Sequence, residues 1–178
     1  MRVFVQAGFD FAAFAASPTR FRIGATDCAT GRATFFDKDD ASMTEALLAS
    51  SSLPMVGRMA RVNGKLYLDG GIADPIPFRQ AAADGHPRRV VVLTRNRGFR
   101  KPAPGAALRA AIRWKYRRFP ALAAAVARQA ETYNRQLDEL AAEEAAGRAL
   151  VIRTSRPLAV GRYSQDRAEL ERLYQNGW

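Results

Sequence analysis

The sequence predicts a three-layer α/β domain, and three observations support this fold class. Short apolar segments typical of strands alternate with segments typical of helices. The segment 89–93 is almost a continuous run of branched aliphatic residues, as in a parallel strand that is covered on both faces. With 178 residues and 48% hydrophobic content, the chain is also long enough to bury a core.

The first part of the chain is predicted to contain two strands and a helix. Residues 21–26 and 32–36 have the composition of strands separated by a turn. Ser42 and Glu45 have the spacing of a capping box, in which the Ser oxygen accepts a main-chain amide and the Glu reaches back. We expect the helix that follows to end before Pro54, because proline disfavours helical geometry in the preceding residue.

A hairpin comes next and leads to an acidic residue. Asn63 and Gly64 separate the apolar segments 59–62 and 65–68. Both residue types tolerate the positive φ that a two-residue hairpin requires. The hairpin therefore places Asp69 at the end of a strand.

The later elements are predicted from composition and spacing. A basic amphipathic helix is expected after the Pro-rich linker at 101–105. Pro120 suits the first turn of the long helix that follows, and Gly147 is expected to end it. The remaining predicted elements are a helix at 78–83, a strand at 149–153 and a helix at 165–174.

The net charge of +11 is concentrated in one part of the chain. Residues 95–118 contain many Lys and Arg but no Asp or Glu, which predicts attraction to polyanions. Because zinc-finger and RNA-binding signatures are absent from the sequence, we expect no nucleic-acid partner. The alternatives are a solvated helix face and peripheral contact with anionic membrane. The residues predicted to contact a membrane are Arg109, Arg113, Trp114, Lys115, Arg117 and Arg118, with Leu108, Ile112 and Phe119 as apolar partners.

Cys28 and His86 are the single residues of their types. One cysteine excludes an internal disulfide and suits a reducing compartment, and a zinc cluster needs more ligands. We therefore expect no metal, no cofactor and a cytoplasmic location, with peripheral membrane contact at the inner face as an extension. No apolar run reaches the roughly 18 residues of a membrane-spanning helix. His86 lies in a predicted surface turn, which argues against a role as catalytic base.

Asp69, Gly70 and Gly71 are the best candidates for chemistry. A carboxylate at a strand end, followed by residues that permit positive φ and close approach of another group, suits a catalytic base. A simple turn is the alternative, because Asp-Gly is a strong turn signal. The sequence contains no G-x-S-x-G. The serines at 50–52 are poor nucleophile candidates, since a helix C-terminus offers carbonyls rather than oxyanion-binding amides.

Several motifs in a fixed order resemble the second half of the patatin-like phospholipases. They are the segments 47–54, 67–71, 74–78 and 90–95. The ending, at 150–153 and 174–177, resembles the bacterial predicted patatin-like esterase branch of that family. The likeness extends from about Asp10 to the C-terminus.

The resemblance implies a Ser-Asp hydrolase of lipid esters. In that family a serine in a nucleophile elbow is paired with the Asp of an Asp-Gly-Gly motif, and Asp69 occupies the matching position, with Gly70 and Gly71 as supporting residues. The elbow and the glycine-rich oxyanion loop of the family are absent from this sequence. We therefore expect an α/β hydrolase-type sheet whose N-terminal part is missing and a chain that is inactive unless an N-terminal partner fragment supplies the serine.

The expected organisation has two parts. Residues 1–100 are the C-terminal part of a patatin-like catalytic domain, and residues 101–178 are a helical and strand extension packed on it. A truncated gene, a frameshift and a split protein are all compatible with this sequence. The alternative function is that of a catalytically inactive, basic α/β module that binds anionic membrane surfaces.

Overall fold

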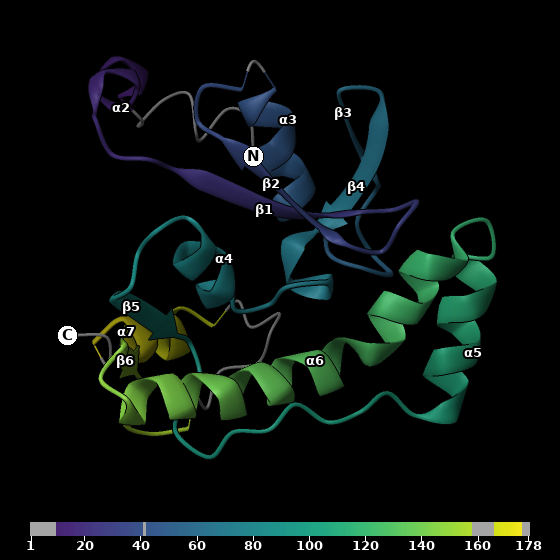
Figure 1. The fold of residues 1–178 in the computed structure, drawn as a ribbon. Coiled ribbons are helices and arrows are strands. Elements are labelled where there is room, and N and C mark those ends of the chain that lie inside the picture. Colours follow the sequence, from purple (N-terminus) through teal and green to yellow (C-terminus); the bar gives the residue numbers. More distant parts are fainter. Residues whose placement is uncertain (1–9, 41, 158–165, 176–178) are drawn as a thin grey trace. The chain divides into compact units, whose positions relative to one another are not determined.

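The computed structural model describes residues 10–40, 42–157 and 166–175 (Figure 1). The chain divides into two compact units. The first unit comprises residues 1–75 and 104–129, and the second comprises residues 76–103 and 130–178. Strands and helices alternate along the chain, which confirms the predicted mixed α/β class. The boundary near residue 100 stays a prediction.

A four-stranded antiparallel sheet forms the centre of the first unit. Its strand order is β2 (Ala33–Asp37), β1 (Arg22–Asp27), β4 (Lys65–Asp69) and β3 (Ala60–Val62). Ala25 of β1 lies opposite Asp69 of β4. The strands differ from their predicted bounds by one residue at most. The Asp-Gly-Gly segment therefore begins where the central strand β4 ends.

The turn between β3 and β4 is the predicted two-residue hairpin. Asn63 has a φ of 47° and Gly64 a φ of 79°, both in the left-handed region. Val62 pairs with Lys65 across the turn. Because these φ values match the twist of the flanking strands, the turn fixes the register of β4 and with it the position of Asp69.

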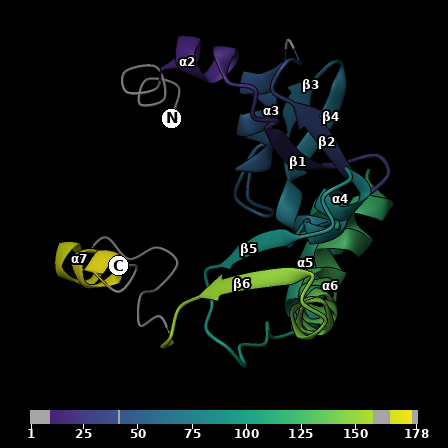
Figure 2. The same ribbon diagram turned by 60° about the vertical axis from the view of Figure 1, so that its left-hand side comes forward.

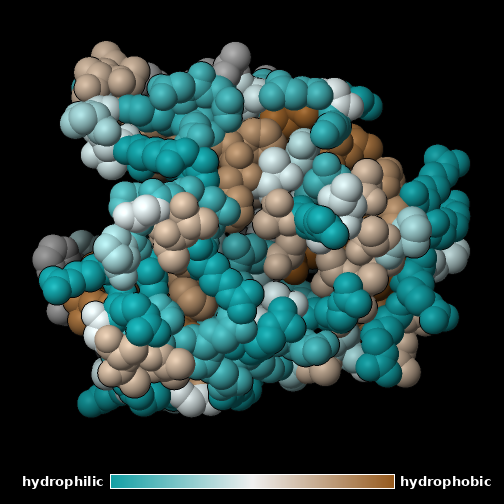
Figure 3. All heavy atoms as spheres, in the orientation of Figure 1, coloured by the Kyte–Doolittle hydropathy of each residue, from teal (hydrophilic) through white to brown (hydrophobic). Residues whose placement is uncertain are grey.

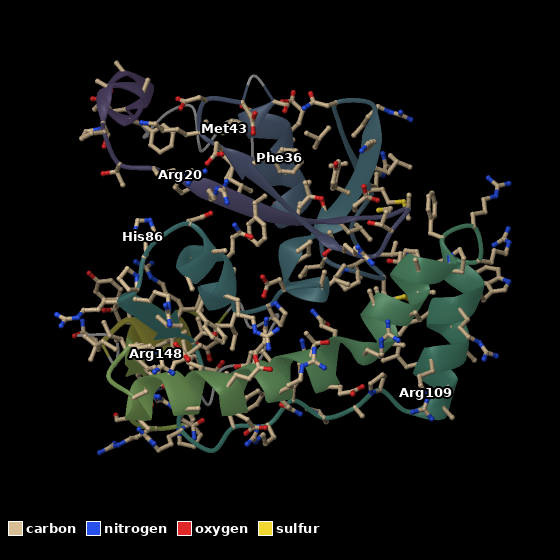
Figure 4. The ribbon with its side chains drawn as sticks, viewed as in Figure 1. Arg20, Phe36, Met43, His86, Arg109 and Arg148 are labelled. Atoms are coloured by element: carbon tan, nitrogen blue, oxygen red, sulfur yellow. The ribbon has the colours of Figure 1, made fainter. Side chains whose placement is uncertain are left out.

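One face of the sheet packs against α3 (Met43–Ser50). The buried side chains of this cluster are Ile23, Ala25, Phe36, Ala46, Ala49, Val62 and Tyr67. Met43 packs on the same cluster, and the rings of Phe36 and Tyr67 meet edge to face at 5.3 Å (Figure 4). The predicted capping box is wrong, because the Ser42 hydroxyl makes no cap and is buried without a hydrogen-bond partner among the described residues. The helix ends at Ser50, before Pro54 as expected, although Pro54 alone would allow it to continue further.

The opposite face of the sheet packs against α5 (Ala106–Lys115) and the start of α6 (Pro120–Ala145). Leu68 points to this face because side chains alternate along a strand. The buried residues of the cluster are Cys28, Leu68, Ile72, Ile112, Tyr116, Leu122, Ala123 and Val126. The hydroxyl of Tyr116 accepts a hydrogen bond from the main-chain amide of Met55 at 2.9 Å. Pro120 opens α6 as predicted.

The second unit contains a parallel strand pair (Figure 2). β5 (Arg89–Leu93) follows α4 (Phe78–Ala83), and β6 (Ala149–Arg153) follows α6. One side of the pair joins the second half of α6 in a cluster whose buried residues are Ile76, Phe78, Leu93, Leu140 and Ala149. The three elements α4, β5 and β6 have their predicted bounds. Two short helices complete the description, α2 (Phe11–Ala16) and α7 (Arg167–Gln175). Gln165, the expected start of α7, lies outside the described residues.

The expectation that segment 89–93 is covered on both faces is not met among the described residues. Val90 and Val92 of β5 are 63% and 68% exposed. Leu150 and Ile152 of β6 are 64% and 52% exposed. The described strands form two separate sheets, one of them antiparallel, instead of one continuous parallel sheet. An apolar face in water is unusual for parallel strands, which normally carry helices on both sides.

Candidate active site

Asp69 ends β4 and starts a single 3₁₀ turn, η1 (Gly70–Ile72). Its side chain is half-buried, and its Oδ1 accepts a hydrogen bond from the main-chain amide of Gly71 at 2.7 Å. The carboxylate thus caps the turn that follows it. This local bond holds one oxygen in place and leaves the other available for a different partner.

The two glycines are needed for space rather than for positive φ. Neither Gly70 nor Gly71 adopts a positive φ. A Cβ on Gly70 would lie 2.3 Å from the carbonyl oxygen of Gly24 in β1, a distance that no real contact tolerates. A Cβ on Gly71 would lie 3.1 Å from Oδ1 of Asp69. The sequence-based emphasis on close approach is therefore confirmed, and the emphasis on positive φ is wrong.

Residues of neighbouring strands and loops form hydrogen bonds with the main chain around Asp69. The hydroxyl of Thr26 donates to the carbonyl of Asp69 at 2.8 Å and accepts from the amide of Ala73 at 3.2 Å. The amide of Asp69 donates to the carbonyl of Ser52 at 3.0 Å. Thr26 is fully buried. The loop that carries the carboxylate is therefore fixed on both sides of η1.

Gln129 of α6 provides one more bond to this loop. Its Nε2 donates to the carbonyl of Gly71 at 2.7 Å. Sequence reasoning missed Gln129, although it lies three residues after Val126 and four before Tyr133, a spacing that puts it on the same face of the helix as these two residues. A polar residue between apolar ones on a helix face is the signal that could have marked it, because polar groups removed from water need a partner.

Asp69 has no ion-pair partner among the described residues. Arg61 of the hairpin donates instead to the carbonyl of Gly64 at 2.9 Å. Within the described part of the chain, Oδ2 of Asp69 also accepts no hydrogen bond. A carboxylate with one anchored oxygen and one open oxygen can accept a proton from a hydroxyl placed beside it.

The comparison with sequence families shows what the segment that contains this site is similar to. The patatin-like phospholipase family matches residues 4–82, which include Asp69 and both of its glycines. This part of the chain is similar to the patatin-like phospholipases. A domain of unknown function, DUF6363, matches residues 119–178. No curated protein matches the chain significantly.

Two of the serines set aside above have structural partners, and the histidine is exposed. The hydroxyls of Ser51 and Ser52 donate to carbonyls at the end of α3, Ser51 to Leu47 at 3.0 Å and Ser52 to Leu48 at 2.7 Å. His86 lies exposed in the turn between α4 and β5 (Figure 4). These positions agree with the sequence-based reasons for setting the serines and the histidine aside.

Cys28 is the one thiol of the chain, and its surroundings make it a poor nucleophile. Burial, and then the negative charge of Asp27, raise the pKa of the Cys28 thiol to about 12. A thiol with such a pKa is almost entirely protonated at neutral pH, and the thiolate is the reactive form. No group of three or more His, Cys, Asp and Glu in the described ranges is arranged to hold a metal ion.

The predicted membrane-contact residues all lie on exposed positions of α5 and the turn after it. Figure 3 shows hydrophilic side chains at the right-hand edge, over α5, where Figure 4 labels Arg109. Trp114 is 73% exposed, and the guanidinium of Arg117 lies 5.6 Å from the centre of its ring. Lys115 donates to the carbonyl of Met55 at 2.5 Å. The exposed members of the set are Arg109, Arg113, Trp114, Lys115, Arg117 and Arg118.

Two apolar residues of this predicted surface face the core instead. Ile112 is only 2% exposed and belongs to the cluster beneath α5. Phe119 is partly buried against the same cluster. Of the apolar residues expected to enter a head-group region, only Leu108 and Trp114 are largely exposed. No helix in the described ranges is long and apolar enough to cross a membrane.

Proposed function

We propose that this chain supplies the catalytic aspartate of a lipid acyl hydrolase, with Asp69 as the proton acceptor for a serine nucleophile. The observation that carries this proposal is the carboxylate itself. Asp69 ends a central strand, is anchored through Oδ1 to Gly71, and has no ion pair with a described residue. A salt bridge would stabilise the ionised form and weaken the base, so the lack of one suits proton acceptance.

The chemistry follows from what an alcohol needs to attack an ester. A serine hydroxyl becomes an effective nucleophile when a base takes its proton as the Oγ–carbonyl bond forms. The open oxygen of Asp69 is suited to take that proton and to return it to the departing alcohol. Water then attacks the acyl-serine by the same route, with Asp69 again accepting a proton. A nearby set of amide donors must stabilise the oxyanion in both steps.

The serine is proposed to come from another segment, because no G-x-S-x-G occurs in the sequence. We expect an N-terminal partner segment to bring the elbow and the glycine-rich oxyanion loop. In the complete enzyme, residues 1–100 would complete the catalytic domain and residues 101–178 would pack on it. By itself the chain should hydrolyse esters slowly or not at all.

The same proposal accounts for the open face of β5 and β6. Val90, Val92, Leu150 and Ile152 form an apolar strip that water does not favour. A strand pair of this kind fits the interior of a larger parallel sheet, and two-stranded sheets are marginal on their own. The three-layer arrangement expected from the sequence would result if the partner segment extended this sheet and covered the strip.

The test is complementation with an elbow-bearing segment of a patatin-like esterase, assayed on a p-nitrophenyl acyl ester. Hydrolysis should require both polypeptides. In the complemented protein, Asp69→Asn should lower kcat by about 10²–10⁴, the usual contribution of a general base. Asp39→Asn, at an exposed position remote in sequence from the loop, is the matched control and should keep the rate. An Asp69→Asn protein that is folded and fully active would end the proposal.

A second candidate function is binding to anionic membrane through α5. The observation in its favour is Trp114, whose large ring is 73% exposed among Arg109, Arg113, Arg117 and Arg118. Basic residues near an anionic surface contribute on the order of 1 kcal/mol each, and an interfacial tryptophan adds apolar contact. This function needs no serine and is compatible with an inactive chain.

Vesicle co-sedimentation distinguishes this second function. Binding should rise with the fraction of anionic lipid and fall with added salt. Trp114→Ala should weaken it, whereas Tyr174→Ala, which removes another exposed aromatic ring, should not. Binding that is independent of lipid charge would contradict the proposed contact.

A further inference from the structure

The DUF6363 match begins at residue 119, and its first helical turns share a core with the loop of Asp69. Leu122 and Val126 of α6 lie in the same buried cluster as Leu68 and Ile72, the residues on either side of the Asp-Gly-Gly segment. All four are at most 7% exposed. The two family matches are therefore joined by one continuous core at the candidate site.

Gln129 adds a directional contact to this packing. Its side-chain amide donates to the carbonyl of Gly71, while the amide of Gly71 donates to Oδ1 of Asp69. Both main-chain groups of Gly71 are thus occupied, one by the carboxylate and one by α6. A movement of Gly71 would move the amide that anchors the carboxylate, so the position of Asp69 depends on Gln129.

We propose that Gln129 is a positioning residue for Asp69, and that the start of the DUF6363 segment serves to hold the Asp-Gly-Gly loop. The catalytic meaning of this inference rests on the proposed function. Its structural content does not, because it concerns the geometry of Asp69 in the chain as it exists. Gln129 acts together with Thr26, which fixes the main chain on the other side of the same turn.

The test compares four full-length variants by amide hydrogen exchange and by the ¹³C signal of the Asp69 carboxyl group. Gln129→Leu and Gln129→Glu remove the donor, Gln129→Lys restores a donor, and Arg128→Leu changes an exposed neighbour on the same helix. In the two donor-free variants the Gly71 amide should exchange about tenfold faster, as expected for local opening after loss of one hydrogen bond. The amides of β1 should keep their rates.

The Asp69 carboxyl signal should shift in both donor-free variants and return toward the original position in Gln129→Lys. Arg128→Leu should leave both readouts unchanged. The inference is overturned if Gly71 exchanges at the original rate without the donor, or if all amides accelerate equally, since that pattern indicates a general loss of stability. If Gln129→Leu does not fold, the exchange rate of the Gly71 amide in Gln129→Glu is compared with that in Gln129→Lys, and this difference tests the inference.

Catalytic complementation separates this inference from the proposed function. A complemented enzyme should lose kcat in Gln129→Glu with KM retained, and Gln129→Lys should recover part of the loss. If complementation yields no esterase activity, the proposed function fails. The hydrogen exchange of the Gly71 amide still tests the positioning role of Gln129, because it does not depend on activity. If Asp69 proves catalytic but Gln129→Glu changes neither exchange nor kcat, only the positioning role fails.

Discussion

The hydroxyl of Thr26 donates to the main-chain carbonyl of Asp69 at 2.8 Å, across two adjacent antiparallel strands. The same oxygen accepts the amide of Ala73 at 3.2 Å. One fully buried side chain therefore connects the start and the end of the turn that carries the carboxylate.

Thr26→Val should destabilise the protein more than Thr26→Ser. Valine keeps the shape of threonine but leaves the Asp69 carbonyl without its hydroxyl donor, which costs about 1–3 kcal/mol. The Ala73 amide loses one of its two acceptors and keeps the carbonyl of Gly70, at 3.2 Å. Serine keeps the hydroxyl and loses one methyl group, at a cost of about 1 kcal/mol. Urea unfolding followed by circular dichroism measures both, and equal losses would show that the hydroxyl contributes little.

Gly70→Ala should destabilise the fold because β1 lies too close. The new Cβ would meet the carbonyl oxygen of Gly24 at 2.3 Å, so one of the two strands must shift. Overpacking of this kind typically costs about 1–3 kcal/mol. Gly105→Ala is the control, since its φ is −64° and no heavy atom lies within 4 Å of the added carbon. Similar melting temperatures for the two variants would contradict the close approach.

The ionised carboxylate of Asp37 should stabilise the folded protein at neutral pH and lose this effect in strong acid. Hydrogen bonds from Arg20 and Arg22 lower the pKa of Asp37 from 3.8 to about 2. Because the folded-state pKa is the lower one, the stabilisation is present above pH 3.8 and is lost as the pH falls through about 2. Asp37→Asn should therefore be less stable than the original protein at neutral pH, and the difference should disappear as the pH falls below about 2. Urea midpoints across this range provide the measurement, and a constant difference would refute the linkage.

Cys28 should resist thiol reagents while the protein is folded. Burial and the charge of Asp27 raise its pKa to about 12, so almost no thiolate is present at neutral pH. Labelling with a coloured disulfide reagent should be slow in buffer and complete in denaturant. Rapid labelling of the folded protein would show that the thiol is accessible and ionisable.

Local signals predicted much of the fold. The hairpin at Asn63 and Gly64 was predicted because its φ requirement depends on two neighbouring residues. The same holds for the start of α6 at Pro120 and for the strand 149–153. The capping box failed because Ser42 is buried, where packing outweighs a preference measured at exposed helix ends.

Contacts between distant segments could not be predicted. The position of Asp69 at a strand end followed from the sequence. Thr26, which binds the carbonyl of Asp69, lies 43 residues away along the chain, and Gln129, which binds the carbonyl of Gly71, lies 58 residues from that glycine. Ile112 was expected at a membrane surface and is buried, because the amphipathic pattern of α5 does not state which apolar residue meets the core. Such choices depend on the neighbouring surface, which the sequence of a helix does not encode.

The shared cluster of Leu68, Ile72, Leu122 and Val126 limits where the polypeptide can be shortened. A product that stops at residue 82, the end of the patatin-like match, would expose aliphatic groups that each contribute about 1.5–3 kcal/mol when buried. Proteolysis between the two matched regions should therefore release an insoluble piece rather than an independent module.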